Sequence, residues 1–263
     1  MKKQIKRNIV ITGSSSGIGQ ALKNHFIANG DFVLGISLSN DDYNCNVSNF
    51  EEMKKVFDDI ATKMDKIDIL IPCAGLGVYG AIELIENVKV KTQYDVNVMG
   101  VINAIQCALP LMKNEGKMVN ISSICELFPI PFRSFYSSNK SAVSMLSDCL
   151  RMELCKTKIQ STAICPCEVK TNFTKNRVNT YASNEKYGDA PSASLNKITE
   201  REDKRMPIEK ATKIIVKIVN KKKLKPQYIM SFRNKLLYQA QKFFPRSLVL
   251  KVLTKMFYKS KKK

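Results

Sequence analysis

The sequence lacks several residues on which common catalytic and structural sites depend. It has no Trp and a single His, His25, which argues against a His-based metal site and against a Ser-His-Asp triad. Its eight Cys contain no Cys-x-x-Cys pair and lie mostly inside apolar stretches. We therefore expect reduced core cysteines, no disulfide framework and no metal ion.

Long apolar runs are also absent. No window reaches the roughly 18 nearly uninterrupted apolar residues that a membrane-spanning helix needs. The basic segment 1–7 leads into a short strand pattern and not into the apolar region of a secretory signal. These absences predict a cytoplasmic protein.

The positive charge is concentrated near the C-terminus. The chain of 263 residues carries a formal net charge of +20, and its length suits one large α/β domain. Residues 1–196 hold 22 Lys and Arg against 19 Asp and Glu, whereas residues 197–263 hold 21 against 4. The first part is thus nearly neutral, and the remainder carries +17.

Apolar, β-branched stretches alternate with helical patterns, which predicts a Rossmann-like, doubly wound parallel sheet with helices on both faces. The connection at 39–43 is too short for a crossover helix, so we expect that helix to be missing or reduced to a turn. Ser48 and Glu51 form a capping box for the next helix. We expect strands at 8–12, 32–37, 67–71, 117–121, 160–165 and 227–230, and helices at 17–28, 48–64, 89–97, 98–112, 133–155 and 208–220.

One pair of residues points to a particular chemistry. Tyr136 and Lys140 are four residues apart in a helical pattern, so they share a helix face and the lysine charge favours the phenolate. A tyrosine whose pKa is lowered from about 10 is a better proton-transfer group at neutral pH. Ser123 follows a predicted strand and supplies a hydroxyl that can hold a carbonyl or alcohol oxygen.

Together with the glycine-rich run at 12–19 and with Asn97, these residues resemble the short-chain dehydrogenase/reductase (SDR) family over about residues 6–171. The resemblance implies that Tyr136 exchanges the proton on the substrate oxygen, which Ser123 orients. It implies that Lys140 lowers the Tyr136 pKa and holds the nicotinamide ribose, and that Asn97 positions a water next to Lys140. Bonding of the Asn97 side chain to backbone is the alternative role, and the two roles coexist in this family.

The resemblance also implies a dinucleotide site. A Gly-x-x-x-Gly-x-Gly turn directly after the first strand lets the backbone approach a pyrophosphate at a helix N-terminus. Val169 and Thr171 correspond to positions that contact the nicotinamide carboxamide. The expected cofactor-binding residues are Gly13, Ser15, Ser16, Gly17, Ile18, Gly19, Ser37, Asn46, Val47, Ala74, Gly75, Tyr136, Lys140, Pro166, Val169 and Thr171.

The end of the second strand bears on the choice between NADP and NAD. NAD-dependent relatives usually carry an acidic residue where this chain has Ser37, and NADP-dependent relatives often carry Arg where it has Leu38. Ser37 and Ser39 can hydrogen-bond a 2′-phosphate without repelling it, so NADP is expected, with NAD as the alternative. Asn46 stands where the family has an adenine-contacting aspartate.

Two departures from the family pattern put cofactor affinity in question. Pro72-Cys73 replaces an Asn-Asn pair that ties a strand to the adenosine pocket, and Cys167 replaces a glycine beside the nicotinamide. The leading hypothesis is an NAD(P)-dependent oxidoreductase that acts on a ketone, aldehyde or alcohol with a lipophilic portion. The alternative is a dinucleotide-binding regulatory or membrane-associated protein with the same fold and little turnover.

The remaining regions concern substrate and partners. The dinucleotide-binding domain is expected at 1–230, with a substrate lid at about 172–206. Residues 231–263 show apolar positions at helical spacing among Lys and Arg, which suits either an amphipathic helix on an anionic membrane or a helix packed on the domain. We expect no nucleic-acid partner, because no recognition motif accompanies the charge. By resemblance, a homodimer or homotetramer is expected.

Overall fold

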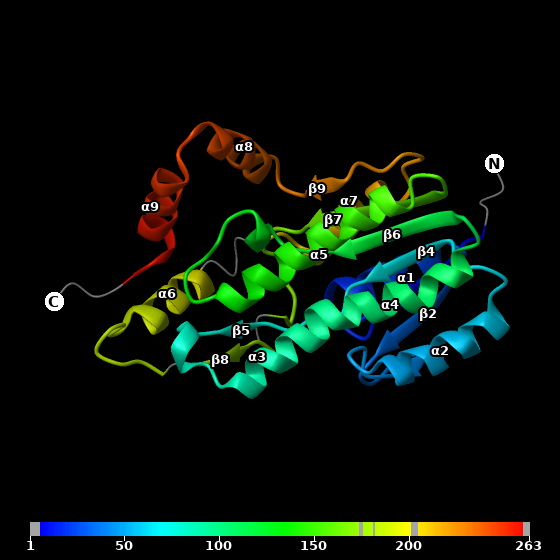
Figure 1. The fold of residues 1–263 in the computed structure, drawn as a ribbon, viewed down its shortest axis with the longest axis horizontal. Coiled ribbons are helices and arrows are strands. Elements are labelled where there is room, and N and C mark those ends of the chain that lie inside the picture. Colours follow the sequence, from blue (N-terminus) through cyan, green and yellow to red (C-terminus); the bar gives the residue numbers. More distant parts are fainter. Residues whose placement is uncertain (1–5, 174–175, 181, 201–204, 260–263) are drawn as a thin grey trace.

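The computed structural model describes residues 6–173, 176–180, 182–200 and 205–259. Its centre is a seven-stranded sheet in the order β3-β2-β1-β4-β6-β7-β9, in which every neighbouring pair is parallel (Figure 1). This confirms the predicted doubly wound sheet. The strands are β1 (Asn8–Thr12), β2 (Phe32–Ser37), β3 (Tyr43–Asn44), β4 (Ile69–Pro72), β6 (Glu115–Ile121), β7 (Lys158–Cys165) and β9 (Gln227–Ile229).

Apolar side chains on both faces of the central strands explain why the sheet lies in the interior. Along β1, Val10 belongs to one buried cluster and Ile9 and Ile11 to another, because successive residues of a strand point to opposite faces. A strand buried on both faces reads as a continuous apolar run, as the parallel sheets of α/β proteins do.

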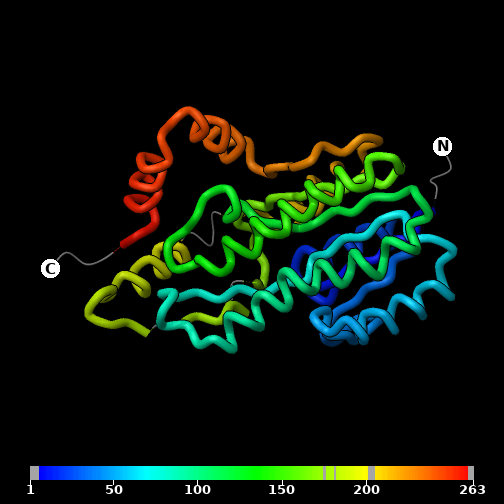
Figure 2. The backbone as a smooth tube through the Cα atoms, viewed as in Figure 1, coloured from blue at the N-terminus to red at the C-terminus, as the bar shows by residue number. Residues whose placement is uncertain are grey.

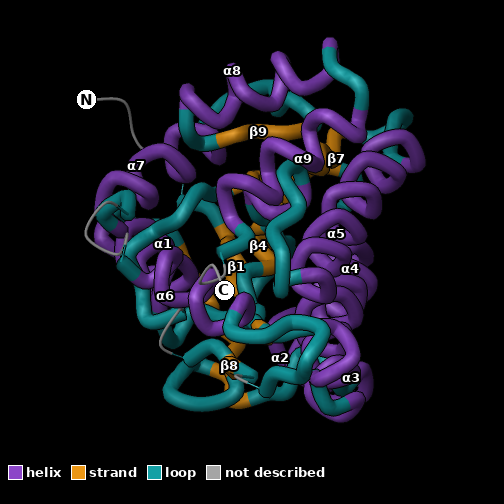
Figure 3. Tube along the Cα trace, turned by 90° about the vertical axis from the view of Figure 1, so that its left-hand side faces the viewer, coloured by secondary structure: helices purple, strands orange, loops and turns teal. Residues whose placement is uncertain are grey.

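Helices cover both faces, and Figure 3 shows α1 and α7 on one side of the strands with α4 and α5 on the other. The cluster on the α1 side includes Leu22 and Ile215, and the opposite cluster includes Phe57, Ala104 and Val143. The helices are α1 (Gly17–Ala28), α2 (Phe50–Lys63), α3 (Asn87–Tyr94), α4 (Gly100–Ala108), α5 (Ser134–Glu153), α6 (Ala190–Thr199), α7 (Ile208–Val219), α8 (Phe232–Ala240) and α9 (Arg246–Phe257).

The connection after β2 confirms one prediction and corrects another. The described chain runs from Ser37 to β3 without a helix, as expected. The cap of α2 is Asn49 and not Ser48, because the Asn49 side chain accepts from the backbone N–H groups of Glu51 and Glu52. The Ser48 hydroxyl instead donates to the Asn46 side chain at 2.8 Å. Asn is as good an N-cap as Ser, so the spacing alone could not separate the two.

Residues 87–112 form one continuous helical run where we expected two helices. A π-helical segment, Asp95–Met99, joins α3 to α4 and contains Asn97. The helix Asn87–Met112 is long and apolar enough to cross a membrane by length and composition alone. In its most apolar 18-residue stretch, 44% is buried inside the protein. Its buried residues Val101, Ala104 and Ala108 belong to the core cluster around α2 and α5, so in this fold it is an interior helix.

The lid region and the C-terminal segment lie at the same end of the molecule (Figures 1 and 2). In the expected lid, β8 (Val178–Asn179) pairs with β5 (Val78–Tyr79), and α6 follows. Residues 174–175, 181 and 201–204 of the lid lie outside the described residues, as do the last lysines of the chain. Helices α8 and α9 form an arch beside the sheet, and the Lys259 backbone N–H donates to Ser194 of α6 at 2.9 Å.

Candidate active site

The carboxyl ends of β1, β4, β6 and β7 open into a cavity of about 1280 Å³. Ligands of open parallel sheets bind at this edge, because loops from distant parts of the chain converge there. Ser123, Tyr136 and Lys140 all line the cavity. So do Gly13, Ser16, Gly17, Ile18, Gly19, Ala74, Gly75, Pro166, Val169 and Thr171.

Strand β6 and helix α5 are joined by hydrogen bonds at the catalytic residues. The Lys140 ammonium group donates to the Ile121 carbonyl at 2.9 Å, and the Ser122 hydroxyl shares its one proton between the Lys140 carbonyl, at 2.9 Å, and Glu126. Burial lowers the pKa of Lys140. These bonds bring the end of β6, which carries Ser123, against the helix turn that carries Tyr136.

The environment of Tyr136 differs from our expectation. Burial raises the Tyr136 pKa above its ordinary value, and a hydrogen bond from Ser123 and the charge of Arg133 offset only part of this effect. The charge of Lys140 does not dominate as expected: its Nζ lies 6.0 Å from the ring centroid and bonds to Ile121, and the effect of burial on the Tyr136 pKa outweighs it. The site without ligands therefore keeps the Tyr136 proton at neutral pH.

Asn97 is fully buried and takes the backbone-bonding role. Its Oδ1 accepts from the Leu76 N–H at 2.8 Å, and its Nδ2 donates to the Leu76 carbonyl at 2.9 Å. Asn97 thereby holds the loop after β4 against the π-helical segment, and such segments often mark functional sites. A role in positioning water remains a prediction.

Glu126 is a buried carboxylate behind the catalytic residues that the sequence analysis missed. It accepts hydrogen bonds from Ser122 and Ser144, from the Cys165 thiol at 3.3 Å, and from the Gln227 amide. Burial nevertheless raises its pKa. Glu126 links β6, α5, β7 and β9 below the site, and only the fold brings these four segments together.

The glycine-rich turn fits a dinucleotide. A Cβ added to Gly13 would lie 2.6 Å from the Ala74 Cα, and one added to Gly19 would lie 2.2 Å from the Gly13 carbonyl oxygen. Gly17 has φ +55° and lines the cavity, and a Cβ added to it would lie 3.7 Å from the Thr171 Cβ. The turn thus presents backbone and no large side chain to the cavity, ahead of the α1 N-terminus, as a pyrophosphate requires.

The departure from the family pattern at Pro72-Cys73 is accommodated by Thr12. Its Oγ1 accepts from the Cys73 N–H at 3.2 Å and from the Ala74 N–H at 3.3 Å, so the turn after Pro72 stays joined to β1. Cys167 lines the cavity, as expected from its place in the sequence. Neither departure closes the site.

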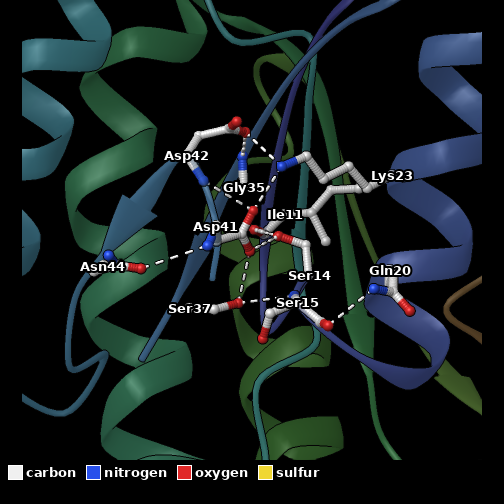
Figure 4. A network of polar contacts seen from close by, with 10 residues as sticks. All are labelled: Ile11, Ser14, Ser15, Gln20, Lys23, Gly35, Ser37, Asp41, Asp42 and Asn44. Carbon is white, nitrogen blue, oxygen red and sulfur yellow. Dashed lines mark hydrogen bonds and ion pairs between the residues drawn. The ribbon is translucent and has the colours of Figure 1, made fainter. Parts of the chain in front are cut away.

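Ser37 belongs to a polar network around Asp41 (Figure 4). The Ser37 hydroxyl donates to Asp41 at 2.7 Å and accepts from the Ser15 N–H at 3.0 Å. Asp41 also accepts from Ser14 at 2.5 Å and pairs with Lys23 at 2.6 Å. Burial alone would raise the Asp41 pKa, but these partners hold it below its usual value.

Two of the expected cofactor-binding residues, Asn46 and Val47, lie outside the cavity lining. Asn46 is exposed, and its Oδ1 accepts from the Ser48 N–H and hydroxyl, so it forms a turn at the start of α2. Val47 is buried in the core, where its Cγ2 lies 2.6 Å from the place of a Cβ on Gly100. Ser15, Ser37, Asn46, Val47 and Asn97 do not line the cavity.

The C-terminal arch forms one wall of the same cavity, which sequence reasoning did not predict. Apolar side chains of α8 and α9 line it at Phe232, Leu237, Leu248, Val252 and Met256. The cavity therefore runs from the glycine-rich turn, past Tyr136, to an apolar wall.

Comparisons with known proteins agree with this geometry. The family described as short chain dehydrogenase matches residues 7–182. A 3-ketodihydrosphingosine reductase of Bacteroides thetaiotaomicron is 33% identical over 207 residues, covering 74% of this chain and 77% of that protein. An NADPH-dependent 3-dehydrocapnine reductase of Ornithobacterium rhinotracheale is 28% identical over 282 residues and covers 98% of each chain.

The fold is shared with solved structures. A crystal structure of a short-chain dehydrogenase from Streptomyces avermitilis superimposes with a TM-score of 0.82 and 21% identity over 96% of each chain. The chain belongs to the short-chain dehydrogenase/reductase family and is an NAD(P)-dependent oxidoreductase that acts on CH–OH or ketone groups.

Proposed function

We propose that this protein reduces a ketone on a lipophilic molecule at the surface of a membrane. The observation that carries the proposal is the single cavity in which Ser123, Tyr136 and Lys140 share space with the apolar wall of α8 and α9. A substrate with an alkyl chain can place its carbonyl at Tyr136 while its chain lies along that wall. Burial of the chain contributes about 0.8 kcal/mol per CH₂ group.

Each catalytic residue has a distinct part in the reaction. The Ser123 hydroxyl donates to the carbonyl oxygen and orients it, and Tyr136 transfers its proton to that oxygen. Lys140, fixed by Ile121, keeps a positive charge below the phenol as negative charge develops. A bound nicotinamide cofactor, held by the glycine-rich turn, supplies the hydride.

The names of two relatives support reduction as the direction of the reaction, and the state of Tyr136 is compatible with it. Burial keeps the Tyr136 pKa above its ordinary value, so the phenol carries the proton that a general acid donates. The two relatives described above are both reductases by name, one of a 3-keto and one of a 3-dehydro compound.

Tyr136→Phe should lower kcat for reduction of a long-chain ketone by about 100-fold or more, because the ring stays and the transferable proton is lost. Cofactor binding, measured by titration of NADH or NADPH fluorescence, should change less than about twofold. The matched control is Tyr94→Phe, since the Tyr94 hydroxyl bonds Ser138 on an exposed surface. Near-normal turnover by Tyr136→Phe would remove this residue from its assigned role.

The contacts of Ser37 favour NAD(H) over the expected NADP(H), and we include this preference in the proposal. A hydroxyl has one proton, and Ser37 gives it to Asp41, so that proton is not available to a phosphate. A lone pair of the hydroxyl remains for a ribose hydroxyl. The nearby cation, Lys23, is paired with both Asp41 and Asp42. The NADPH-dependent relative weighs the other way, but at 28% identity it need not share this network.

Asp41→Ala removes the acceptor of the Ser37 proton and one of the two carboxylates that pair with Lys23. Both groups can then bind a 2′-phosphate, so the ratio of NADPH affinity to NADH affinity should rise about tenfold. The matched control is Asp42→Ala, because Asp42 also pairs with Lys23 but does not contact Ser37 in the described contacts. Calorimetric titration gives both affinities, and thermal melting checks the fold of each variant. The account of this pocket is wrong if the native protein already binds NADPH more tightly.

The outer surface of the arch fits an anionic membrane. Residues 232–263 hold ten Lys and Arg and no Asp or Glu. Leu236 and Phe243 are 55% and 85% exposed and do not line the cavity, and in α9 only Leu253 is buried. Most of the apolar side chains of α8 and α9 therefore lie outside the core. Exposed apolar side chains among cations combine insertion into lipid with attraction to anionic headgroups.

Sedimentation with vesicles tests this surface. The native protein should co-sediment with vesicles that contain phosphatidylserine and should be released as salt rises, because each Lys or Arg near the surface contributes about 1 kcal/mol that salt screens. Leu236→Ser combined with Phe243→Ser should weaken binding about tenfold, since both side chains are exposed and neither lines the cavity. Ile27→Ser, an exposed apolar residue of α1, is the control and should have no effect. Equal loss by the control would contradict the assignment.

The exposed face of α5 supports a homodimer as part of the proposal. Met145 and Met152 are 65% and 66% exposed on this helix, next to α4 on the same side of the sheet. Light scattering of the native protein should give twice the mass of one chain, or four times for a tetramer. Met145→Lys combined with Met152→Lys should give the mass of a single chain, since two buried charges oppose association. A native monomer would refute the dimer.

A further inference from the structure

Arg133 is a cation of the cavity that the mechanism does not use. It stands at the start of α5, three residues before Tyr136, and lines the cavity. Its Nε is buried and has no hydrogen-bond partner, and the closest described partner of its Nη1 is the Cys125 sulfur at 4.0 Å. No ion pair joins Arg133 to an Asp or Glu among the described residues.

The position of this charge is at the substrate end of the cavity. Arg133 acts on Tyr136 and on Tyr79, whose pKa values it lowers against the larger effect of burial. Neither tyrosine belongs to the glycine-rich turn, which is the part of the cavity expected to hold the cofactor. Arg133 is the N-cap residue directly before α5, it lines the same cavity as Tyr136, and its charge acts on the Tyr136 hydroxyl, so a ligand whose oxygen lies at Tyr136 is near the guanidinium group.

A buried guanidinium donor without a partner is costly unless a ligand completes it. A polar group that is buried without a partner has lost its hydration, and the loss is larger when the group is charged. The planar guanidinium group matches the paired oxygens of carboxylates, sulfonates and phosphates, which it binds through two parallel N–H···O bonds. The remaining requirement is a ligand that brings such an anion next to Tyr136.

We propose that Arg133 binds a small anionic group of the substrate, attached within a few bonds of the carbonyl that Tyr136 protonates. This inference rests on the proposed function and narrows its substrate class. The substrate is then a ketone with a carboxylate, sulfonate or phosphate on one side of the carbonyl and an alkyl chain on the other. The anion lies at Arg133, and the chain lies along the α8 and α9 wall.

The test is a comparison of 3-hydroxydodecanoate with its methyl ester, which differ in one charge. Calorimetry should show that the native protein binds the acid at least about tenfold more tightly than the ester. Arg133→Gln should remove this preference and leave the ester affinity unchanged, and Arg133→Lys should keep part of it. Arg233→Gln, which exchanges another arginine lining the cavity, is the control and should keep the preference.

Reduction of 3-oxododecanoate and its methyl ester separates this inference from the proposed function. If the acid binds through Arg133 but neither ketone is reduced, the anion site stands and the proposed reaction fails. If both ketones are reduced equally well and Arg133→Gln slows neither, the reaction stands and the anion site fails. Equal binding of acid and ester by the native protein also overturns the inference.

Discussion

The active site depends on the way strand β6 and helix α5 are bonded to each other. The Lys140 side chain donates to Ile121 at the end of the strand, and Ser122, the next residue, donates back to the backbone of Lys140. Glu126 supports this junction from below, because it accepts from Ser122 and from Ser144 of α5. The strand delivers Ser123 and the helix delivers Tyr136, so the junction determines whether the two hydroxyls meet one oxygen atom. Positioning of this kind accounts for much of the rate in proton-transfer enzymes.

The second constraint is the continuity of the cavity. One end is made of backbone at the glycine-rich turn, where added Cβ atoms at Gly13 and Gly19 would collide with neighbouring chain. The other end is made of apolar side chains from α8 and α9, which bury little of themselves against the domain. A helix that leaves its apolar face uncovered needs a partner. In the proposed function, a lipophilic substrate on the inner face and a membrane on the outer face are these partners.

The sequence predicted the parts of this structure that depend on local patterns. Alternating strands and helices, the missing helix after Ser37 and the Tyr136/Lys140 spacing are all visible in neighbouring residues. The sequence did not reveal that Asp41 takes the Ser37 proton, because that contact needs the turn after β2 to fold back. It also placed the α2 cap one residue early, at Ser48, since Ser and Asn cap equally well. Arg133 and Glu126 were missed because only the folded chain shows the partners of Glu126 and the lack of a described partner at the Arg133 Nε.

The central claim is that this cavity transfers a hydride to a carbonyl carbon. It is tested most directly by supplying the native protein with a long-chain 3-oxo acid and with nicotinamide cofactor deuterated at C4, then locating the deuterium by mass spectrometry. The account predicts an alcohol product with one deuterium on the carbinol carbon. A product alcohol without deuterium, or unchanged ketone in the presence of bound reduced cofactor across a series of chain lengths, would contradict it.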